Sequence, residues 1–328
     1  MFVVLKTILI TCLSFLITVY ITPLLIRVAY KFAIVDKPDG KLKIHEQSTP
    51  YLGGIAVYFG FLVASSLVMP FENNFFLFVI ASTILLFVGL LDDLIVLNPS
   101  QKFFGQILAA LCYIKAGFYL KGAFFGNTWN ISLSFLWVLG LINAFNLIDV
   151  MDGLACTLAL CIAFSYGIFA VVFGNYNLLL LLAAFIGSVF GFLFFNKPPA
   201  RIYLGDSGSL FLGGLLACVP FTISWSEYNQ YGYVIPIIVC AIPLLECGTL
   251  ILVRTYKKIP FYRGSPDHFS IFLQAKGWHK NNILLLTFIC TALCTLVSLL
   301  LFFNFIPFVV VVGCGILFIV WWYLNLVI

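Results

Sequence analysis

The sequence predicts an all-α polytopic membrane protein. Of its 328 residues, 63% are apolar and 9% are charged, whereas about 25% of an average soluble domain is charged. The apolar residues form long runs, and roughly 20 of them suffice for one membrane-spanning helix. This composition excludes a soluble enzyme, a DNA-binding domain and a disordered chain. About eleven spans would use most of the chain, so residues 1–328 are expected to form a single integral membrane domain.

Eleven apolar runs have the length of spanning helices. They lie at 3–26, 52–70, 75–91, 103–120, 131–148, 154–173, 177–195, 210–225, 231–253, 283–303 and 306–328. No small-residue cleavage site follows the first run, so we expect a retained span rather than a signal peptide. The ten cysteines all lie in apolar runs and lack metal-ligand spacing. We interpret them as small apolar fillers.

The loops between these runs alternate in charge. One set holds, with its flanks, 14 of the 17 basic residues and comprises 30–51, 92–102, 149–153, 196–209 and 254–282. The other set consists of short, nearly neutral turns such as FENN at 71–74. Since basic loops remain in the cytoplasm, eleven spans put the N-terminus outside and the C-terminus in the cytoplasm. The net charge of +5 thus reflects membrane orientation, and we expect no nucleic-acid partner.

Asp92 and Asp93 directly follow the third apolar run. The C-terminus of a helix is the negative end of its dipole, so two carboxylates there are disfavoured unless a cation offsets them. Carboxylate oxygens suit Mg²⁺. The alternative is a pair of solvated acids that marks the end of the span.

A polar stripe interrupts the end of the fifth run, where NAFNLIDVMDGLA places Asn143, Asn146, Asp149 and Asp152 at intervals of three. Such residues share one side of a helix, and polar groups at membrane depth usually face a cavity or a partner. Amides suit a base or sugar edge, and carboxylates suit ribose hydroxyls or a metal. The alternative is that the asparagines join neighbouring helices.

The segment NKPPARIYLGDSGS (196–209) opens the eighth run. Its small residues would let a phosphate approach the backbone N–H groups of a helix N-terminus, and Asp206 would hold a metal that bridges this phosphate. The alternative is that Asp206 is an ordinary N-cap.

Two basic loops on the same face add Lys43, His45, Arg263 and His268. These residues are candidates for contacts with an anionic substrate, although basic loops also follow from membrane orientation alone. Glu246 stands alone inside the ninth run and is a further functional candidate. Carboxylates and basic residues on one membrane face indicate a cytoplasmic site for a polyanion and Mg²⁺.

These segments resemble the polyprenyl-phosphate N-acetylhexosamine-1-phosphate transferases. The similarity rests on HEQSTPYLGG (45–54), GLLDD (89–93), NAFNLIDVMDGLA, NKPPARIYLGDSGS and a histidine in the last loop, in the family's order. It implies a bacterial inner-membrane enzyme with Mg²⁺, a UDP-N-acetylhexosamine donor and an undecaprenyl-phosphate acceptor. It also implies catalytic roles for Asp92, Asp93 and His268, and metal ligands at Asp206 and Asp93. Substrate-binding roles then fall to the polar stripe and to the basic residues Lys43, His45 and Arg263.

The loop SPDHFSIFL has one histidine where the family usually has several. This favours the branch that initiates O-antigen and teichoic-acid linkage synthesis over the peptidoglycan branch. The expected reaction is attack of the lipid phosphate on the β-phosphorus of the UDP-sugar, with release of UMP. The oligomeric state stays open, with a homodimer as one alternative.

Two other functions are alternatives to sugar-phosphate transfer. A secondary transporter would also carry intramembrane Asp and Asn, but its sites lie near the midplane of the membrane. A CDP-alcohol phosphotransferase would need an Arg after its DGxA segment, whereas Cys156 follows Asp152–Ala155 here.

Overall fold

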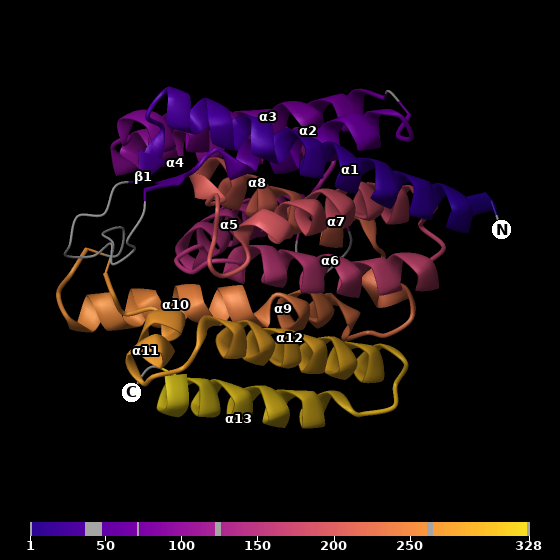
Figure 1. The fold of residues 1–328 in the computed structure, drawn as a ribbon. Coiled ribbons are helices and arrows are strands. Elements are labelled where there is room, and N and C mark those ends of the chain that lie inside the picture. The colour runs from indigo at the N-terminus through magenta and orange to yellow at the C-terminus, as the bar shows by residue number, and fades with distance from the viewer. Residues whose placement is uncertain (1, 37–47, 71, 122–125, 261–264, 327–328) are drawn as a thin grey trace.

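A computed structural model describes residues 2–36, 48–70, 72–121, 126–260 and 265–326 (Figure 1). These ranges are almost entirely helical. The helices are α1 (Phe2–Lys31), α2 (Gly53–Ser66), α3 (Asn73–Ile95), α4 (Pro99–Lys115), α5 (Asn127–Ile148), α6 (Leu154–Val172), α7 (Tyr176–Asn196), α8 (Gly205–Cys218), α9 (Ile235–Val239), α10 (Ala241–Tyr256), α11 (Phe269–Ala275), α12 (Lys280–Phe302) and α13 (Phe308–Leu326). Two-residue strands, β1 (Val35–Asp36) and β2 (Thr49–Pro50), pair antiparallel between α1 and α2.

Seven helical segments in the described ranges are long and apolar enough to cross a membrane. They comprise α1, α3, α5, α6, α7, α12 and α8 with the turns that follow it. An eighth span results if α9 and α10 are one bent span, while α2 and α13 are shorter apolar helices. An all-helical fold with several spanning helices is thus confirmed. The count of eleven and the orientation of the termini stay predictions.

The span expected at 231–253 is bent, by 68° between Gly232–Val239 and Ala241–Tyr256. Pro243 lies one turn beyond Val239 and has no N–H to donate to the Val239 carbonyl. Its ring also crowds that carbonyl, so the helix breaks there. The bend gives α10 a direction of its own and sets it against α5.

Helices α4 and α8 begin four and five residues before their apolar runs, and in both a polar contact accounts for the early start. Helix α4 starts at Pro99, because Asn98 and Gln101 form a reciprocal capping box around its first turn. Helix α8 starts at Gly205, five residues before the predicted span, because the Asp93 carboxylate accepts hydrogen bonds from its first amides. Both extensions place polar residues on helices where hydropathy alone predicted loops.

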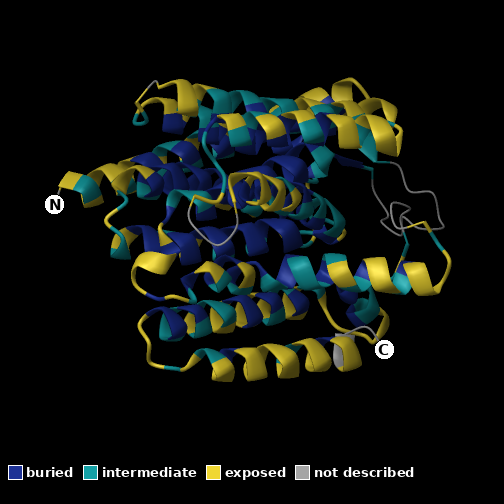
Figure 2. Ribbon diagram, turned by 180° about the vertical axis from the view of Figure 1, so that it is seen from behind, coloured by how far each residue is buried: buried dark blue, intermediate teal, exposed yellow. Residues whose placement is uncertain are grey.

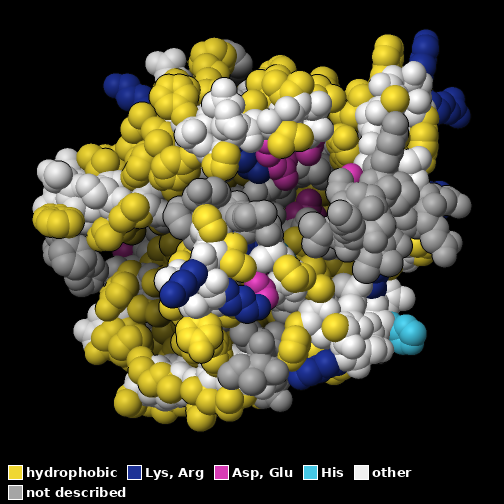
Figure 3. All heavy atoms as spheres, turned by 90° about the vertical axis from the view of Figure 1, so that its left-hand side faces the viewer, with side chains coloured by type: hydrophobic (Ala, Val, Ile, Leu, Met, Phe, Trp, Pro, Cys, Tyr) yellow, Lys and Arg dark blue, Asp and Glu magenta, His cyan; other side chains and the backbone are white. Residues whose placement is uncertain are grey.

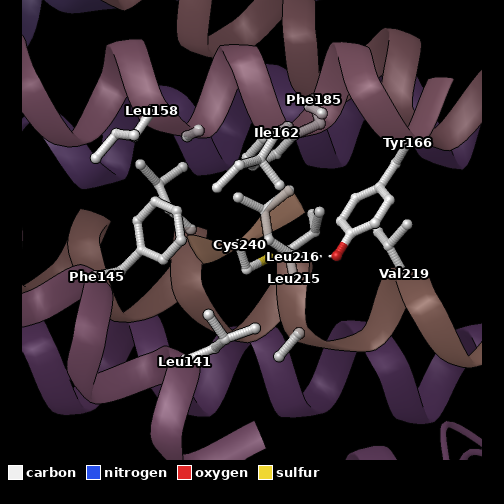
Figure 4. Close-up of a cluster of buried hydrophobic side chains, with 14 of the residues drawn as sticks. Leu141, Phe145, Leu158, Ile162, Tyr166, Phe185, Leu215, Leu216, Val219 and Cys240 are labelled. Atoms are coloured by element: carbon white, nitrogen blue, oxygen red, sulfur yellow. Dashed lines mark hydrogen bonds between the residues drawn. The ribbon is translucent and has the colours of Figure 1, made fainter. Parts of the chain in front are cut away.

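Helix α8 lies in the middle of the molecule, with α1–α4 on one side and α9–α13 on the other (Figure 1). Every residue of α8 from Ser207 to Cys218 is buried. Figure 2 shows that buried segments fill the interior of the molecule and that its outermost helices are largely exposed. Its residues Leu215 and Leu216 share an apolar cluster with Phe145 of α5 and Ile162 of α6 (Figure 4). A central, fully packed α8 fixes the position of its N-terminus, where Asp206 lies.

Candidate active site

The carboxylate of Asp93 caps helix α8. Its two side-chain oxygens accept hydrogen bonds from the backbone N–H groups of Asp206, at 2.9 Å, and Ser207, at 3.2 Å. A negative charge at a helix N-terminus offsets unpaired N–H groups and the positive end of the helix dipole. The last turn of α3 is therefore joined to the first turn of α8, although 113 residues separate them in the sequence.

Two glycines allow this contact. A Cβ at Gly89 would lie 2.3 Å from the backbone nitrogen of Ser207, so only glycine lets α3 and α8 approach this closely. Gly205 has φ of +74°, in the left-handed region that favours glycine, and a Cβ there would lie 2.7 Å from an Asp93 oxygen. The segments GLLDD and GDSGS are thus two halves of one junction.

Asp92 points to a different partner. Its Oδ1 accepts a hydrogen bond from the backbone of Leu97 at 2.7 Å, and its Oδ2 accepts one from Lys102 Nζ at 2.9 Å. Lys102 lies in the first turn of α4. Its ammonium also donates to Oδ2 of Asp206 and, at 3.0 Å, to Oδ1 of Asn146. One ammonium therefore joins oxygens from α3, α5 and α8.

Asn146 completes this cluster from α5. Its side-chain nitrogen donates to Asp206 Oδ1 at 2.8 Å and to Ser209 Oγ at 3.0 Å. These contacts turn its carbonyl oxygen toward Lys102. We call Asp92, Lys102, Asn146 and Asp206 the polar cluster. It lies at the left-hand end of the molecule in Figure 1, and Figure 3 shows acidic side chains gathered near the middle of that end, beside Lys and Arg.

Asp149 follows the last residue of α5, so the prediction that Asp149 and Asp152 continue the helical stripe is wrong; Asp149 is half-buried. No hydrogen bond or ion pair joins its carboxylate to another residue in the described part of the chain. Burial raises the pKa of Asp149 well above its usual range, and the negative charges of Asp206, Asp93 and Asp152 raise it further. Asp149 is thus an acid without a partner among the described residues, and it lies close enough to Asp206 to feel its charge.

Asp152 is held differently. Its Oδ2 accepts a hydrogen bond from Lys280 Nζ, at 2.8 Å, and a longer one from the Ala200 amide, at 3.4 Å. Beside it, the buried Asn196 accepts from the Gly153 amide and donates to the Ile202 carbonyl, both at 3.0 Å. These bonds fasten the loop after α5 to the segment that leads into α8.

Asn143 donates to Gln106 of α4 at 2.8 Å and to the Leu139 carbonyl at 2.8 Å. This contact is the one expected if the amide joins two helices. Its predicted substrate contact stays a prediction.

His268 forms a separate pair with Glu246. The ring nitrogen Nδ1 lies 3.1 Å from Glu246 Oε1, which also accepts the Phe269 amide at 3.3 Å. Both side chains are buried. In the described residues no hydrogen bond links this pair to the polar cluster, so a catalytic role for His268 stays a prediction. Lys43, His45 and Arg263 lie outside the described residues.

The chemistry of the polar cluster suits a hard divalent cation. Two carboxylates and an amide oxygen converge on one positively charged group, and such oxygens are the ligands of Mg²⁺. Among the described residues, no group of three Asp, Glu, His or Cys side chains is close enough to form a ready metal site. The donors therefore fit the ion, with Lys102 at their centre. Both oxygens of Asp93 already accept backbone N–H groups, so the geometry favours Asp92 as the partner of Asp206.

Sequence reasoning counted Lys102 only as a loop charge. The spacing of Lys102 and Gln106, which lie one helical turn apart after the acidic pair, would have predicted that both lie on one face of a helix. Both face the polar stripe of α5, Lys102 toward Asn146 and Gln106 toward Asn143.

Comparison with known proteins gives two kinds of match. The model of glycosyl transferase family 4 matches residues 75–224, a range that contains the whole polar cluster. The probable undecaprenyl-phosphate N-acetylglucosaminyl 1-phosphate transferase of Bacillus subtilis (strain 168) is 32% identical over 286 residues, which are 83% of this chain and 79% of that protein. The phospho-N-acetylmuramoyl-pentapeptide-transferase of Streptococcus pneumoniae serotype 2 (strain D39 / NCTC 7466) is 32% identical over 238 residues, 64% of this chain and 71% of that protein.

Proposed function

This chain belongs to glycosyl transferase family 4, and we propose that it transfers N-acetylhexosamine 1-phosphate from a UDP-sugar to undecaprenyl phosphate. The products are UMP and a polyprenyl-diphosphoryl sugar that initiates a cell-envelope glycan. The observation that carries the proposal is the convergence of Asp92, Asn146 and Asp206, from three motifs, at one end of a helical membrane protein.

We propose UDP-N-acetylglucosamine as the donor. The Bacillus subtilis relative is named for the N-acetylglucosaminyl group and aligns over more of this chain than the Streptococcus pneumoniae protein does. The last loop, with its single histidine, supports the same branch, in which O-antigen or teichoic-acid linkage synthesis begins.

The reaction exchanges one phosphoanhydride for another. An oxygen of the lipid phosphate forms a bond to the β-phosphorus of the UDP-sugar, and the bond from this phosphorus to the oxygen shared with UMP breaks. A phosphate monoester is already largely dianionic at neutral pH, since its second pKa is about 6. Positioning and charge neutralisation therefore matter more than proton removal. Asp92 remains our candidate base if a proton must be taken.

The residues of the chain divide these tasks. Asp206 and Asp92 would hold Mg²⁺, which would neutralise the diphosphate when bound. Asp93 fixes the position of Asp206 through the start of α8. Asp149 and Asp152, on the loop after α5, are proposed to face the nucleotide, and His268 and Arg263 to donate hydrogen bonds to phosphate oxygens.

The predicted membrane orientation is consistent with this assignment. The described helix ends that flank the basic loops, such as the C-terminal ends of α1 and α10, lie at the same end of the molecule as the start of α8 (Figure 1), and these loops are predicted to be cytoplasmic. We therefore propose an active site on the cytoplasmic face of the bacterial inner membrane.

The direct test is release of UMP by purified protein given undecaprenyl phosphate, Mg²⁺ and one UDP-sugar at a time. We expect release with UDP-N-acetylglucosamine, and only when the lipid phosphate is present. UMP release that does not need the lipid would indicate hydrolysis and would overturn the proposal. If UDP-N-acetylmuramoyl-pentapeptide is the only donor that gives lipid-dependent release, the chain belongs to the peptidoglycan branch instead.

A further inference from the structure

We propose that Lys102 occupies the cation position of the polar cluster, so that its ammonium and a divalent cation are alternative occupants of the same oxygens. On this view Lys102 leaves the oxygens of Asp92, Asp206 and Asn146 when the cation binds. The freed ammonium then binds an oxygen of the substrate diphosphate. The identity of the cation as Mg²⁺ rests on the proposed function, whereas the competition rests on the geometry.

The ammonium lies where a cation would lie. It contacts one oxygen from each of three helices, at 2.9 Å from Asp92 Oδ2, at 3.0 Å from Asn146 Oδ1, and at Oδ2 of Asp206. The side chains are partly withdrawn from solvent, with exposed fractions of 17% for Lys102, 15% for Asp92 and 31% for Asp206. A position shared by three oxygens from three helices belongs to the fold rather than to one flexible side chain.

The orientation of Asn146 is part of this arrangement. Its nitrogen is committed to Asp206 Oδ1 and Ser209 Oγ, so its oxygen must face Lys102. The reversed amide would place its oxygen against a carboxylate and its nitrogen against the ammonium. An acceptor held toward the ammonium in this way would serve a metal ion equally well.

Two cations cannot share these oxygens. An ammonium within hydrogen-bond distance of the same carboxylate oxygens would repel a divalent ion there. Lys102 is the group that can move, because its charge sits on a flexible four-carbon stem. The backbone of Asp206 stays in place, since the Asp93 cap and the Gly89 contact fix the start of α8.

Displacement gives Lys102 a task in the reaction. Its backbone stays in the first turn of α4, so the ammonium remains beside the polar cluster after it is released. A diphosphate bound to the cation would lie within reach of this side chain, and an ammonium is a good donor to phosphate oxygens. Without the cation, Lys102 holds the two carboxylates together. With the cation and the diphosphate bound, its ammonium adds positive charge beside the phosphate oxygens.

The first test measures Mn²⁺ affinity, by the electron paramagnetic resonance signal of free Mn²⁺, with full-length protein and no substrate. We expect Lys102→Gln to bind Mn²⁺ about tenfold more tightly than the wild type, because a competing occupant lowers apparent affinity. Lys102→Arg keeps the charge and should bind no more tightly than the wild type. Lys115→Gln removes a charge from the exposed, far end of the same helix and should change nothing. Equal or weaker binding by Lys102→Gln would overturn the proposal.

A second measurement needs no variant and stands even if Lys102→Gln fails to fold. An amine-modifying reagent is applied to the wild type, and modification of Lys102 is quantified by mass spectrometry. We expect the rate to rise about threefold or more at saturating Mg²⁺, as the ammonium leaves its three acceptors. An unchanged or lower rate would mean that lysine and metal coexist, and would overturn the proposal.

The two proposals can fail separately. If the wild type releases UMP as expected but Mn²⁺ affinity and lysine modification do not respond, only the competition is wrong. If they respond but no UDP-sugar yields UMP, the competition stands and the proposed function is wrong.

Discussion

Asp92 and Asp93 have different partners although one peptide bond joins them. Successive helix residues point about 100° apart, so one carboxylate reaches α8 and the other reaches α4. Asp93 accepts two backbone N–H groups, whereas Asp92 accepts Lys102 and the Leu97 amide. Asp93 therefore has a structural role at the start of α8, whereas Asp92 can take part in binding a cation or the substrate.

This division predicts different costs for the two Asn substitutions. Asp93→Asn removes the charge at the α8 N-terminus and should lower the free energy of unfolding by about 1–2 kcal/mol. Asp92→Asn keeps an oxygen that can accept the Leu97 amide and leaves Lys102 with Asp206 and Asn146, so it should cost less than about 1 kcal/mol. Thermal unfolding in detergent, followed by tryptophan fluorescence, measures both. A larger loss for Asp92→Asn would show that the Asp93 cap contributes less to stability than the Asp92–Lys102 pair does.

Asp149 predicts a pH effect of opposite sign to that of a paired acid. Its pKa is raised in the folded protein by burial and by neighbouring acids, so the folded state binds more protons than the unfolded state above about pH 4. The stability of the metal-free wild type should therefore fall as pH rises through this window. Asp149→Asn lacks this loss, and its melting temperature should exceed that of the wild type by a margin that grows with pH.

The measurement is a series of melting curves in EDTA from about pH 5 to about pH 8. A margin that stays constant or shrinks as pH rises would refute the assigned cause. Activity should fall in the same variant, since the carboxylate is proposed to face the nucleotide.

At the scale of elements, the junction of α3 and α8 positions the site. Gly89→Ala would place a Cβ 2.3 Å from Ser207 N and 2.4 Å from the Asp206 carbonyl carbon, so one helix must move. We expect a loss of about 1–3 kcal/mol in stability, together with loss of activity, because Asp206 shifts with its helix. The matched control is Gly140→Ala in α5, where a Cβ would meet nothing within 4 Å. This control should be neutral or stabilising by up to about 1 kcal/mol. Equal effects at both positions would show that the close contact between α3 and α8 does not position Asp206.

The elements also show what the sequence could and could not predict. Hydropathy located the long helices, because a spanning helix needs a continuous apolar run, but it missed the seven-residue α11 inside the predicted loop 254–282. It misplaced the start of α8 because that start depends on Asp93, which is remote in sequence. Lys102 was missed for a similar reason, since its three partners come from three helices and no local pattern brings them together. Pro243 predicts the bend at Cys240, but hydropathy averaged over about 20 residues does not detect a break caused by one residue.

At the scale of the molecule, the end of α3, the end of α5 and the start of α8, which carry three of the motifs, lie at one end of the helices (Figure 1). This arrangement predicts that the whole end faces the cytoplasm. In a cysteine-free background, single cysteines at 73 and 175 should react with a membrane-impermeant reagent applied outside, and one at 257 should not. Outside labelling at 257 would reverse the orientation and exclude a cytoplasmic UDP-sugar site.

The central claim is that the polar cluster performs sugar-phosphate transfer. It is tested most directly by mass spectrometry of the polyprenyl-diphosphoryl sugar formed by Asp206→Asn and by Glu227→Gln. Asp206 joins α8 to Lys102 and Asn146, whereas Glu227 is an exposed acid on the turns beyond the other end of α8. We predict that Asp206→Asn loses about 100-fold or more of the product while it still folds, since one lost contact to developing charge costs this much, and that Glu227→Gln matches the wild type. Product formation by folded Asp206→Asn within about tenfold of the wild type would contradict the account.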